Sequence, residues 1–579
     1  MQKDLFSNQK HTIRRFFSML WKAKLPYVWI ILFIAASVYL VKVGIDVTEY
    51  TAQMFAGNVS FSGIILPFII YSVGTLLLSS VNGIFKGICS AKIDRALRRM
   101  VWSKTVSLPF GFFQSNDPKE LITRITNDIS SISKIVMNVF VGFLISFYTV
   151  FSLVRQVGSY DPRLMWVMVI MLPLDIIIAI IMGRLNFGIN DRLNWSFARL
   201  NRTISERVSQ SLLIRSFGTQ ESEEKRVEGL STDYRKNQIR STWINNLSSP
   251  FSTMTYCMKF ILLLLVGRHF YGGGMISLPE WIAFFAFSTQ LTTYISSYTT
   301  DWINLKAAMG STERVSEIID TPSEIVDQGK TVEELSGELR AEDITFGYGD
   351  EPLFEHLSVT IPVGLRTALV GSSGSGKTTL LNLFAGLYDL WDGKITVGGE
   401  NITQYTRRSY RSQLNYITQE CTLFSGTLRQ NLLYGLRREV GDEELNAACE
   451  QAGLLDYVNE LPAGYETEIG EGGSALSGGQ RQKLSVARML LKKGNWLFMD
   501  EATAAMDASA KAQVWGATES LSEGCTCLFV AHDRQSVSYA QHVIVLEKGR
   551  IVDQGPTDEV ARRNAYVGSL LHADVREEG

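Results

Sequence analysis

The sequence carries almost no net charge, because its 579 residues include 56 lysines and arginines against 58 aspartates and glutamates. Nucleic-acid-binding chains concentrate positive charge, so this balance does not suggest a nucleic-acid partner. A cleavable signal is also lacking, since the first residues, MQKDLFSNQKHTIRRFF, are polar. The six cysteines lack metal-site spacing, and Cys525-Thr-Cys527 is too tight for a zinc pair and is typical of core packing.

Long uncharged runs are absent after residue 304 but frequent before it. About 20 apolar residues are needed to cross the ~30 Å hydrocarbon layer of a bilayer. If these runs were buried core helices, the first half would be an unusually apolar soluble protein. We therefore predict six membrane spans, which are Pro26–Val41, Phe61–Phe85, Ile135–Val154, Leu164–Gly183, Ser248–Phe270 and Trp281–Thr300.

The basic residues between these runs predict the orientation. The segments 1–25, 86–134 and 184–247 together hold 26 lysines and arginines. The segments on the opposite side of the predicted spans, 46–60, 155–163 and 268–280, together hold three. Because basic residues are enriched in cytoplasmic loops, we expect the N-terminus and everything after the sixth span to be cytoplasmic. The two long inner segments show helical periodicity, so the spans are expected to continue below the membrane and to turn near 109–113 and 215–218.

The pattern changes after the sixth span. Residues 305–335 lose hydrophobicity and include Thr321-Pro322, and short apolar strands alternate with helical stretches from about residue 336. We predict a helical membrane domain over 1–320, a linker over 321–335 and an α/β domain over 336–579.

A glycine-rich loop, GSSGSGKT, occupies residues 371–378. It lies between a predicted strand, Arg366–Val370, and a predicted helix, Thr379–Leu387, which is the context that a phosphate-binding loop requires. Its glycines let backbone N–H groups converge on phosphate oxygens, and the helix N-terminus favours negative charge. Lys377 is expected to reach the β and γ phosphates, and Thr378 is expected to ligate Mg²⁺.

A second predicted strand, Trp496–Met499, ends in Asp500-Glu501. A carboxylate at a strand tip suits Mg²⁺, because oxygen ligands match a hard cation. Asp500 is therefore a candidate Mg²⁺ ligand, and Glu501 is a candidate general base for the attacking water.

The segment LSGGQ at residues 476–480 resembles the signature of ATP-binding cassette (ABC) transporters, and the spacing from the phosphate loop to Asp500 fits that family. Four further landmarks follow the family order. Tyr348 resembles the aromatic residue that stacks on adenine, Gln419 the glutamine that senses Mg²⁺ and water, Asp507 the loop through which paired cassettes communicate, and His532 the histidine that contacts the γ phosphate.

The resemblance implies three overlapping sets of residues. The catalytic set is Lys377, Glu501 and His532. The Mg²⁺ set is Thr378, Gln419 and Asp500. The ATP-binding set is Tyr348, Gly371, Ser372, Ser373, Gly374, Ser375, Gly376, Lys377, Thr378, Thr379, Gln419, Ser477, Gly478, Gly479, Gln480 and Asp507.

The sequence departs from the common family pattern at a few positions. Ala504 and Met506 replace the usual serine and leucine, residues 471–473 lack an arginine often found there, and Asp533 follows the histidine where a basic residue is usual. None of these changes removes a catalytic group.

Together these features resemble a half-size exporter-type ABC transporter, with an all-α six-span domain followed by an α/β phosphate-loop cassette. The family places ATP between the phosphate loop of one cassette and the signature of another, which implies a second half-transporter. A homodimer is favoured because this chain keeps its essential groups, although a heterodimer stays open.

The cargo is less clearly indicated. Asp175 and Lys259 are charges within predicted spans, where charge is costly and tends to be paired or functional, and Gln290 lies in a sixth span rich in aromatic and hydroxyl residues. These residues suit a cavity for an amphipathic small molecule, lipid or peptide.

The leading hypothesis is ATP-driven export across a prokaryotic plasma membrane. Two alternatives are an importer of a siderophore-like compound with an exporter fold, and a regulatory or channel-like membrane ATPase.

Overall fold

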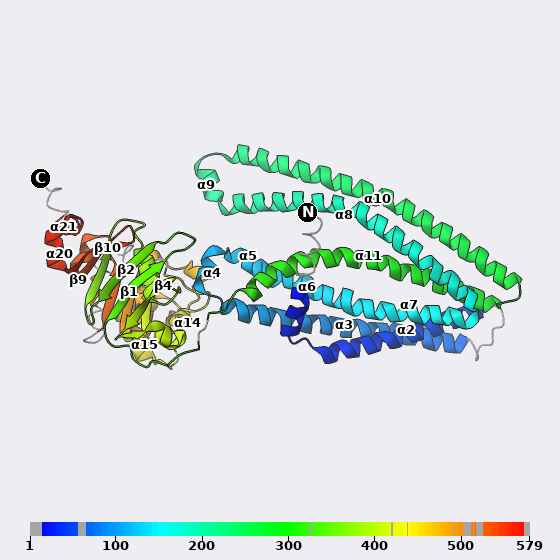
Figure 1. Ribbon diagram of the computed structural model, residues 1–579, viewed down its shortest axis with the longest axis horizontal. Coiled ribbons are helices and arrows are strands. Elements are labelled where there is room, and N and C mark those ends of the chain that lie inside the picture. The colour runs from blue at the N-terminus through cyan, green and yellow to red at the C-terminus, as the bar shows by residue number, and fades with distance from the viewer. Residues whose placement is uncertain are drawn as a thin grey trace. The chain divides into compact units, whose positions relative to one another are not determined.

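The computed structural model of the chain describes residues 14–55, 65–324, 327–418, 421–436, 438–492, 494–501, 511–512, 515–516 and 525–572. The chain divides into two compact units. The first comprises residues 1–107 and 116–322, and the second comprises residues 108–115 and 323–579. The first unit is built of helices and the second combines helices with two sheets (Figure 1).

Long helices make up the first unit. From α5 to α7 the chain is helical throughout and contains two π-helical stretches, η2 and η3. The elements are α2 (Tyr27–Phe55), α3 (Leu66–Val106), α5 (Pro118–Thr123), η2 (Arg124–Asp128), α6 (Ile129–Ile135), η3 (Val136–Val141), α7 (Gly142–Tyr160), α8 (Pro162–Ser209), α9 (Ser211–Ser216), α10 (Gln220–Gly272) and α11 (Leu278–Asp320).

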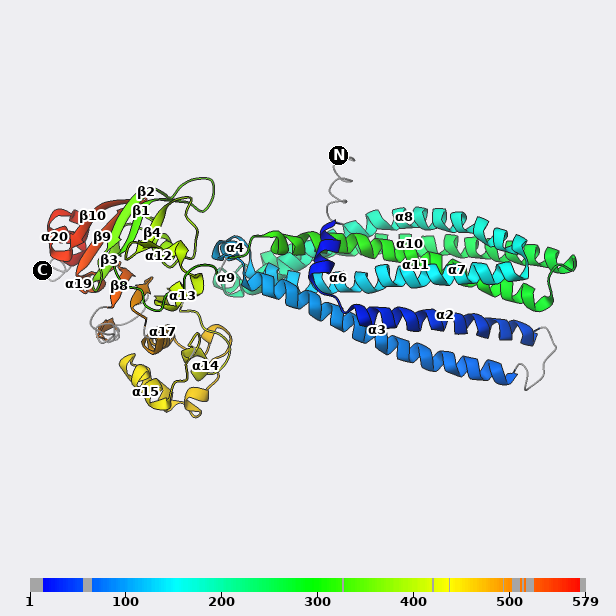
Figure 2. The ribbon, with the colours of Figure 1, turned by 60° about the horizontal axis from the view of Figure 1, so that its bottom comes forward.

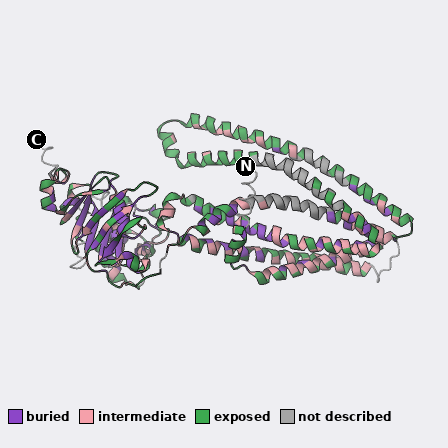
Figure 3. Ribbon diagram, viewed as in Figure 1, coloured by how far each residue is buried: buried purple, intermediate pink, exposed green. Residues whose placement is uncertain are grey.

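Three stretches of the described chain are long and apolar enough to cross a membrane, namely α2, α3 and the run Glu120–Tyr160. They overlap the first two predicted spans and contain the third, and residues 61–64 of the second span lie outside the described residues. The other three predicted spans fall within α8, α10 and α11, which include residues whose side chains lie outside the described set, so their role as spans stays a prediction. Many large apolar side chains of the first unit are exposed, as lipid contact requires (Figure 3).

Local chemistry explains where two of these helices begin and how closely two of them approach. Asp161 caps α8 by accepting a hydrogen bond from the N–H of Arg163, and Ser277 with Glu280 forms a capping box at the start of α11. A Cβ at Gly267 of α10 would lie 2.1 Å from the indole nitrogen of Trp281 on α11. Glycine at this position therefore allows the indole to pack directly on the backbone of α10.

The second unit contains two sheets. The first has four antiparallel strands in the order β2-β1-β4-β5, and the second has six strands in the order β10-β9-β3-β8-β7-β6. Within the second sheet only β10 is antiparallel to its neighbour. The strands are β1 (Leu339–Phe346), β2 (Phe354–Ile361), β3 (Arg366–Val370), β4 (Asp392–Val397), β5 (Glu400–Asn401), β6 (Leu414–Ile417), β7 (Trp496–Met499), β8 (Thr526–Val530), β9 (His542–Glu547) and β10 (Arg550–Pro556).

Helices pack on both faces of the six-stranded sheet. Buried residues concentrate in the strands (Figure 3). Strands β3, before the phosphate loop, and β7, before Asp500, have the predicted bounds. The helix predicted over 379–387 is α12, which begins two residues earlier, at Lys377, and ends at Phe384. The helices are α4 (Phe110–Ser115), α12 (Lys377–Phe384), η4 (Ile402–Gln404), α13 (Arg407–Ser412), α14 (Leu428–Leu432), α15 (Asp442–Gln451), α16 (Leu455–Glu460), η5 (Gly464–Glu466), η6 (Glu471–Gly473), α17 (Gly478–Lys492), α19 (Arg534–Ser538), α20 (Thr557–Arg563) and α21 (Ala565–His572).

The short helix α4 belongs to the second unit although it lies between α3 and α5 in sequence. The ring of Phe110 lies 5.5 Å from that of Tyr388, and the Tyr388 hydroxyl donates to the side-chain oxygen of Gln114. Both α4 and α9 fall where the sequence predicts that the long helices turn.

A charge cluster with two buried members, Asp128 and Arg124, joins η2 to α11 in the first unit. The Asp128 carboxylate is 5% exposed and accepts hydrogen bonds from Arg314 Nε at 2.8 Å, Arg314 Nη2 at 2.5 Å and Ser311 Oγ at 2.9 Å. One turn away, the buried Arg124 donates to Glu317 at 2.8 Å. Burying a carboxylate is costly unless it is paired, so these bonds fix the register between the two segments.

We expect Arg314→Gln to destabilise the protein by about 2–3 kcal/mol, because it removes the charge that compensates buried Asp128. Adding Asp128→Asn should recover most of this loss, since neither partner is then charged. Thermal unfolding of the purified protein in detergent measures both effects, and Arg215→Gln, at an exposed position on α9, is the control. Equal unfolding temperatures for the single and double variants would contradict the compensation.

Candidate functional site

The topology of the six-stranded sheet brings three predicted segments to one edge. Strands β3 and β8 lie side by side (Figure 2). In the strand order β8 lies between β3 and β7, and the three strands are parallel. The phosphate loop follows β3, Asp500 and Glu501 follow β7, and His532 follows β8 closely. Ligands bind at the carboxyl ends of parallel strands, so this edge is the candidate site.

The loop after β3 depends on glycine at two points. Gly371 has φ +150°, and a Cβ there would lie 2.0 Å from the carbonyl oxygen of Leu546. Gly376 has φ +105° and precedes the first residue of α12, so the chain enters the helix from a left-handed conformation that glycine adopts readily. The loop can therefore curl tightly over the first turn of α12.

The loop is built to take an anion. Ser375 Oγ is buried and makes no hydrogen bond to a described residue, although it sits where the loop meets the helix. Lys377 is also buried, and its Nζ donates to the carbonyl oxygens of Gly371 at 3.0 Å and Ser372 at 2.9 Å. A lysine and a hydroxyl directed inside a curled loop match the donors that phosphate needs.

The charge of Lys377 is set by opposing effects. Burial lowers its pKa, while the nearby carboxylates of Glu501 and Asp500 raise it. Negative phosphate arriving at the loop favours the charged form further.

Asp500 lies directly beside the loop. Thr378 Oγ1 donates to Asp500 Oδ1 at 3.0 Å, and the Asp500 side chain is largely buried. Burial raises the pKa of Asp500, as does the charge of Glu501, while the bond from Thr378 lowers it. A hydroxyl and a carboxylate in contact, both directed at the phosphate side of α12, fit Mg²⁺, which prefers oxygen ligands shared with phosphate.

Glu501 and His532 form a pair at the same edge. His532 Nε2 lies 2.6 Å from Glu501 Oε1, with 38% and 28% of the respective side chains exposed. Glu501 has φ +49°, a left-handed conformation that is strained for a residue with a side chain. This turn directs the chain away from β7 at the point where a base is needed.

Tyr348 lies beside the start of α12 and is 56% exposed. Its hydroxyl is 2.9 Å from Thr379 Oγ1, and its ring meets the ring of Tyr388 edge-on at 5.5 Å. Tyr388 also contacts α4, so an aromatic path joins the predicted adenine-stacking residue to α4. Sequence reasoning missed Tyr388, because nothing in the residues around it marks this contact.

The signature residues open α17. The side chain of Gln480 accepts from the N–H of Ser477 at 2.8 Å, and Ser477 Oγ accepts from the N–H of Gln480 at 3.2 Å. Ser477 and Gly478 are exposed, and α17 and α12 are distinct helices of the second unit (Figure 2). The exposed start of α17 can meet an anion from outside this chain.

The structure also accounts for one departure from the family pattern. Asp533 caps α19 by accepting from the N–H of Ser536 at 2.7 Å, and Lys511 donates to it at 2.8 Å. Asp533 therefore has a structural role beside His532.

The remaining predicted residues are described in part. Gln419 and Asp507 lie outside the described residues, as does the side chain of Asp175, so contact between Asp175 and Lys259 stays a prediction. Lys259 is buried on α10, and Gln290 is exposed on α11. Ser372, Ser373 and Gly374 are exposed within the loop, and Thr379 is buried beneath Tyr348.

Two family profiles match the chain. Residues 354–504 match the family profile described as ABC transporter, and residues 28–295 match that described as ABC transporter transmembrane region. An ATP-dependent lipid A-core flippase from Syntrophus aciditrophicus (strain SB) is 32% identical over 84% of this chain and 82% of its own. A multidrug resistance ABC transporter ATP-binding and permease protein from Lactococcus lactis subsp. cremoris (strain MG1363) is 27% identical over 95% of this chain and 94% of its own.

The fold is shared with a solved structure of a bacterial Atm1-family ABC exporter with ATP bound. The TM-score is 0.82, with 20% identity over 96% of this chain and 98% of the other. The described chain thus combines a membrane region with one ATP-binding, ATP-hydrolysing cassette. It belongs to the ABC transporter family and is a half-size transporter of the exporter type.

Proposed function

We propose that this chain is one half of an exporter that moves an amphipathic small molecule, lipid or peptide out of the cytoplasm by alternating access. The carrying observation is the convergence of the phosphate loop, the Thr378–Asp500 contact and the Glu501–His532 pair on one sheet edge, in a chain that also contains apolar helices long enough to cross a membrane. We further propose that residues 1–320 form the transport domain, 321–335 the linker and 336–579 the cassette.

The roles of the site residues follow from their positions. Lys377, Ser375 and the loop backbone bind the phosphates of ATP, and Tyr348 stacks on the base. Thr378, Asp500 and Gln419 hold Mg²⁺, which neutralises phosphate charge when bound. Glu501 polarises the attacking water, and His532 holds the Glu501 carboxylate in place and contacts the γ phosphate.

A second half-transporter completes the site in this proposal. The signature turn at Ser477 and Gly478 is exposed, and the helix start it presents suits phosphate bound by another chain. The hairpin of α8, α9 and α10 also exposes large apolar side chains at its turn, with Leu212 81% and Phe217 74% accessible. Such side chains at the cytoplasmic end of a membrane protein support docking on a second copy.

Glu501→Gln should reduce steady-state ATP hydrolysis at least about a hundredfold, because the amide cannot accept the proton of the attacking water. ATP binding should persist, since Glu501 does not form the phosphate loop. Phosphate release and binding of labelled ATP measure the two effects on purified protein, with Lys377→Ala as the variant that loses binding as well. Hydrolysis near the wild-type rate would remove Glu501 from the role of base.

The shared-site proposal predicts an unusual complementation. In a purified mixed dimer of one Lys377→Ala chain with one Ser477→Arg chain, one of the two sites combines intact Lys377 with intact Ser477. With Glu501→Gln added to both chains to trap nucleotide, this dimer should retain one ATP, whereas either single-variant homodimer should retain none. If each site lay within one chain, both sites of the mixed dimer would be defective and no ATP would be trapped.

The membrane arrangement is also part of the proposal. The excess of basic residues in the inner segments supports a plasma-membrane protein with a cytoplasmic N-terminus and cassette. We place the cargo between the spans, where Asp175, Lys259 and Gln290 are candidate contacts. Buried Lys259 supports this, because a charge within a span tends to be retained for function.

Inside-out membrane vesicles that contain the protein should accumulate a fluorescent amphipathic probe when Mg-ATP is added, because export carries the probe into their lumen. Vesicles with the Glu501→Gln variant should stay at the level seen without ATP. ATP-dependent loss of the probe from preloaded inside-out vesicles would contradict export and indicate import.

A further inference from the structure

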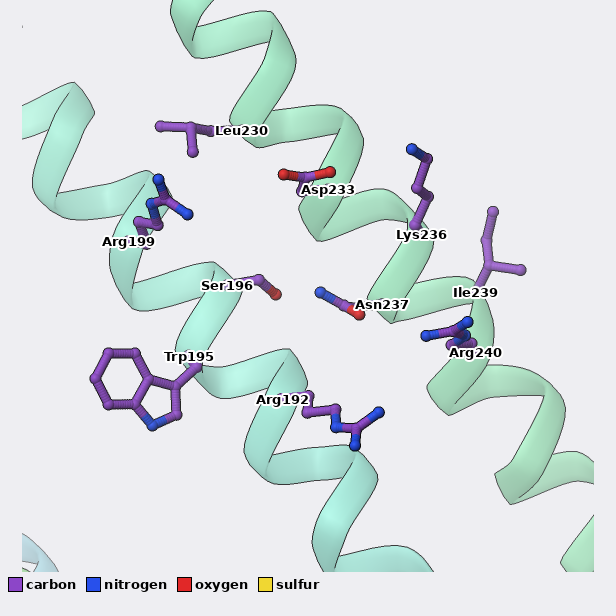
Figure 4. Close-up of a pocket in the computed structure, with 10 residues that line it drawn as sticks. All are labelled: Arg192, Trp195, Ser196, Arg199, Leu230, Asp233, Lys236, Asn237, Ile239 and Arg240. Carbon is purple, nitrogen blue, oxygen red and sulfur yellow. The ribbon is translucent and has the colours of Figure 1, made fainter.

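A groove of about 660 Å³ lies between α8 and α10 in the first unit. Four residues of α8 and six of α10 line it, and they repeat at helical spacing, so one face of each helix forms each wall (Figure 4). The lining residues are Arg192, Trp195, Ser196, Arg199, Leu230, Asp233, Lys236, Asn237, Ile239 and Arg240.

The lining is strongly basic. It holds the cations Arg192, Arg199, Lys236 and Arg240 but a single carboxylate, Asp233. Two other cations of this hairpin are paired with acids: Arg207 bonds to Glu223 at 2.6 Å and Lys225 to Glu221 at 2.7 Å. Among the described residues, none of the four groove cations has a carboxylate within ion-pair distance.

The side chains that reach into the groove are chiefly hydrogen-bond donors. Ser196 and Asn237 point toward one another across the gap, and the guanidinium groups of Arg192 and Arg240 lie at the same end (Figure 4). Asp233 and Leu230 lie toward the other end (Figure 4). Two guanidinium groups, an amide NH₂ and a hydroxyl match an oxyanion with several acceptor oxygens, and arginine binds phosphate with paired N–H groups.

The depth of the groove relative to the membrane allows two sources of this anion. Arg192 follows the predicted end of the fourth span by nine residues, and Arg240 precedes the predicted start of the fifth by eight. At 1.5 Å per residue both lie about 12–14 Å beyond the hydrocarbon layer. The headgroup layer is about 5–8 Å thick, and an arginine side chain extends several ångströms further, so a lipid headgroup and a cytosolic phosphate compound are both within reach.

We propose that this groove binds a phosphate-bearing anion, held by Arg192, Arg240, Ser196 and Asn237. The bound anion joins α8 to α10 and offsets part of the positive charge of the four cations. The assignment of depth rests on the proposed membrane orientation, whereas binding itself is independent of ATP hydrolysis and transport. An apolar helix of a second copy fits less well, because it would remove four charges from water without compensating them.

The test uses the full-length protein carrying Lys377→Ala, so that the phosphate loop does not contribute to phosphate binding. Arg192→Gln/Arg240→Gln removes two groove charges. Arg202→Gln/Arg235→Gln is the matched control, because these arginines are exposed on the same two helices and outside the groove. Native mass spectrometry in detergent with phosphatidylglycerol, against phosphatidylcholine, measures lipid binding, and calorimetric titration with inorganic pyrophosphate measures soluble phosphate.

We expect the groove variant to bind at least one of the two phosphate probes about tenfold or more weakly than the parent protein, and the control variant to match the parent within about twofold. A loss confined to phosphatidylglycerol assigns the site to a lipid headgroup, and a loss confined to pyrophosphate assigns it to a soluble ligand. Equal binding by all three proteins to both probes would overturn the proposal. A groove variant that binds normally but fails to dimerise would instead assign the groove to the contact between copies.

Discussion

The loop after β3 gathers hydrogen-bond donors and one buried cation at an edge of the parallel sheet, and the attraction of this loop for phosphate is the interaction on which the other parts depend. Gly371 can curl there because it has no Cβ to meet the backbone of β9, and Lys377 stays inside the curl. Asp500 contacts Thr378 at the start of α12, and the Glu501–His532 pair completes the edge. Each of these groups can take part in ATP hydrolysis only when phosphate is bound at the loop.

In a transporter, ATP binding or hydrolysis at that edge must change the conformation of the membrane helices. The described contacts suggest one path by which binding of the nucleotide base could act on α4. Tyr348 contacts Tyr388, and Tyr388 contacts Phe110 and Gln114 of α4. Burial raises the pKa of the Tyr388 hydroxyl, which therefore stays protonated and able to donate. In the first unit, the bonds between Asp128 and Arg314 hold η2 against α11, so displacement of one segment carries the other.

Much of the site was predictable because its motifs are local. The strand bounds 366–370 and 496–499 follow from apolar runs closed by glycine or acid, and the loop follows from its glycines and lysine. Contacts that join distant segments left no such pattern. Tyr388 and the π-helical turn at Asp128 depend on tertiary packing, and the groove between α8 and α10 depends on which helix faces meet. Helix ends also shifted, since Gly376 starts α12 earlier than the apolar pattern indicates.

The two bonds from Lys377 to carbonyl oxygens of the loop have a further consequence. Its ammonium already has two carbonyl partners in the loop, and the Tyr348 hydroxyl already has Thr379. Nucleotide therefore exchanges one set of contacts for another, and the net gain is smaller than the phosphate contacts alone would give. A loop whose donors have partners of their own binds phosphate with a smaller net free energy, which favours the exchange of one nucleotide for the next.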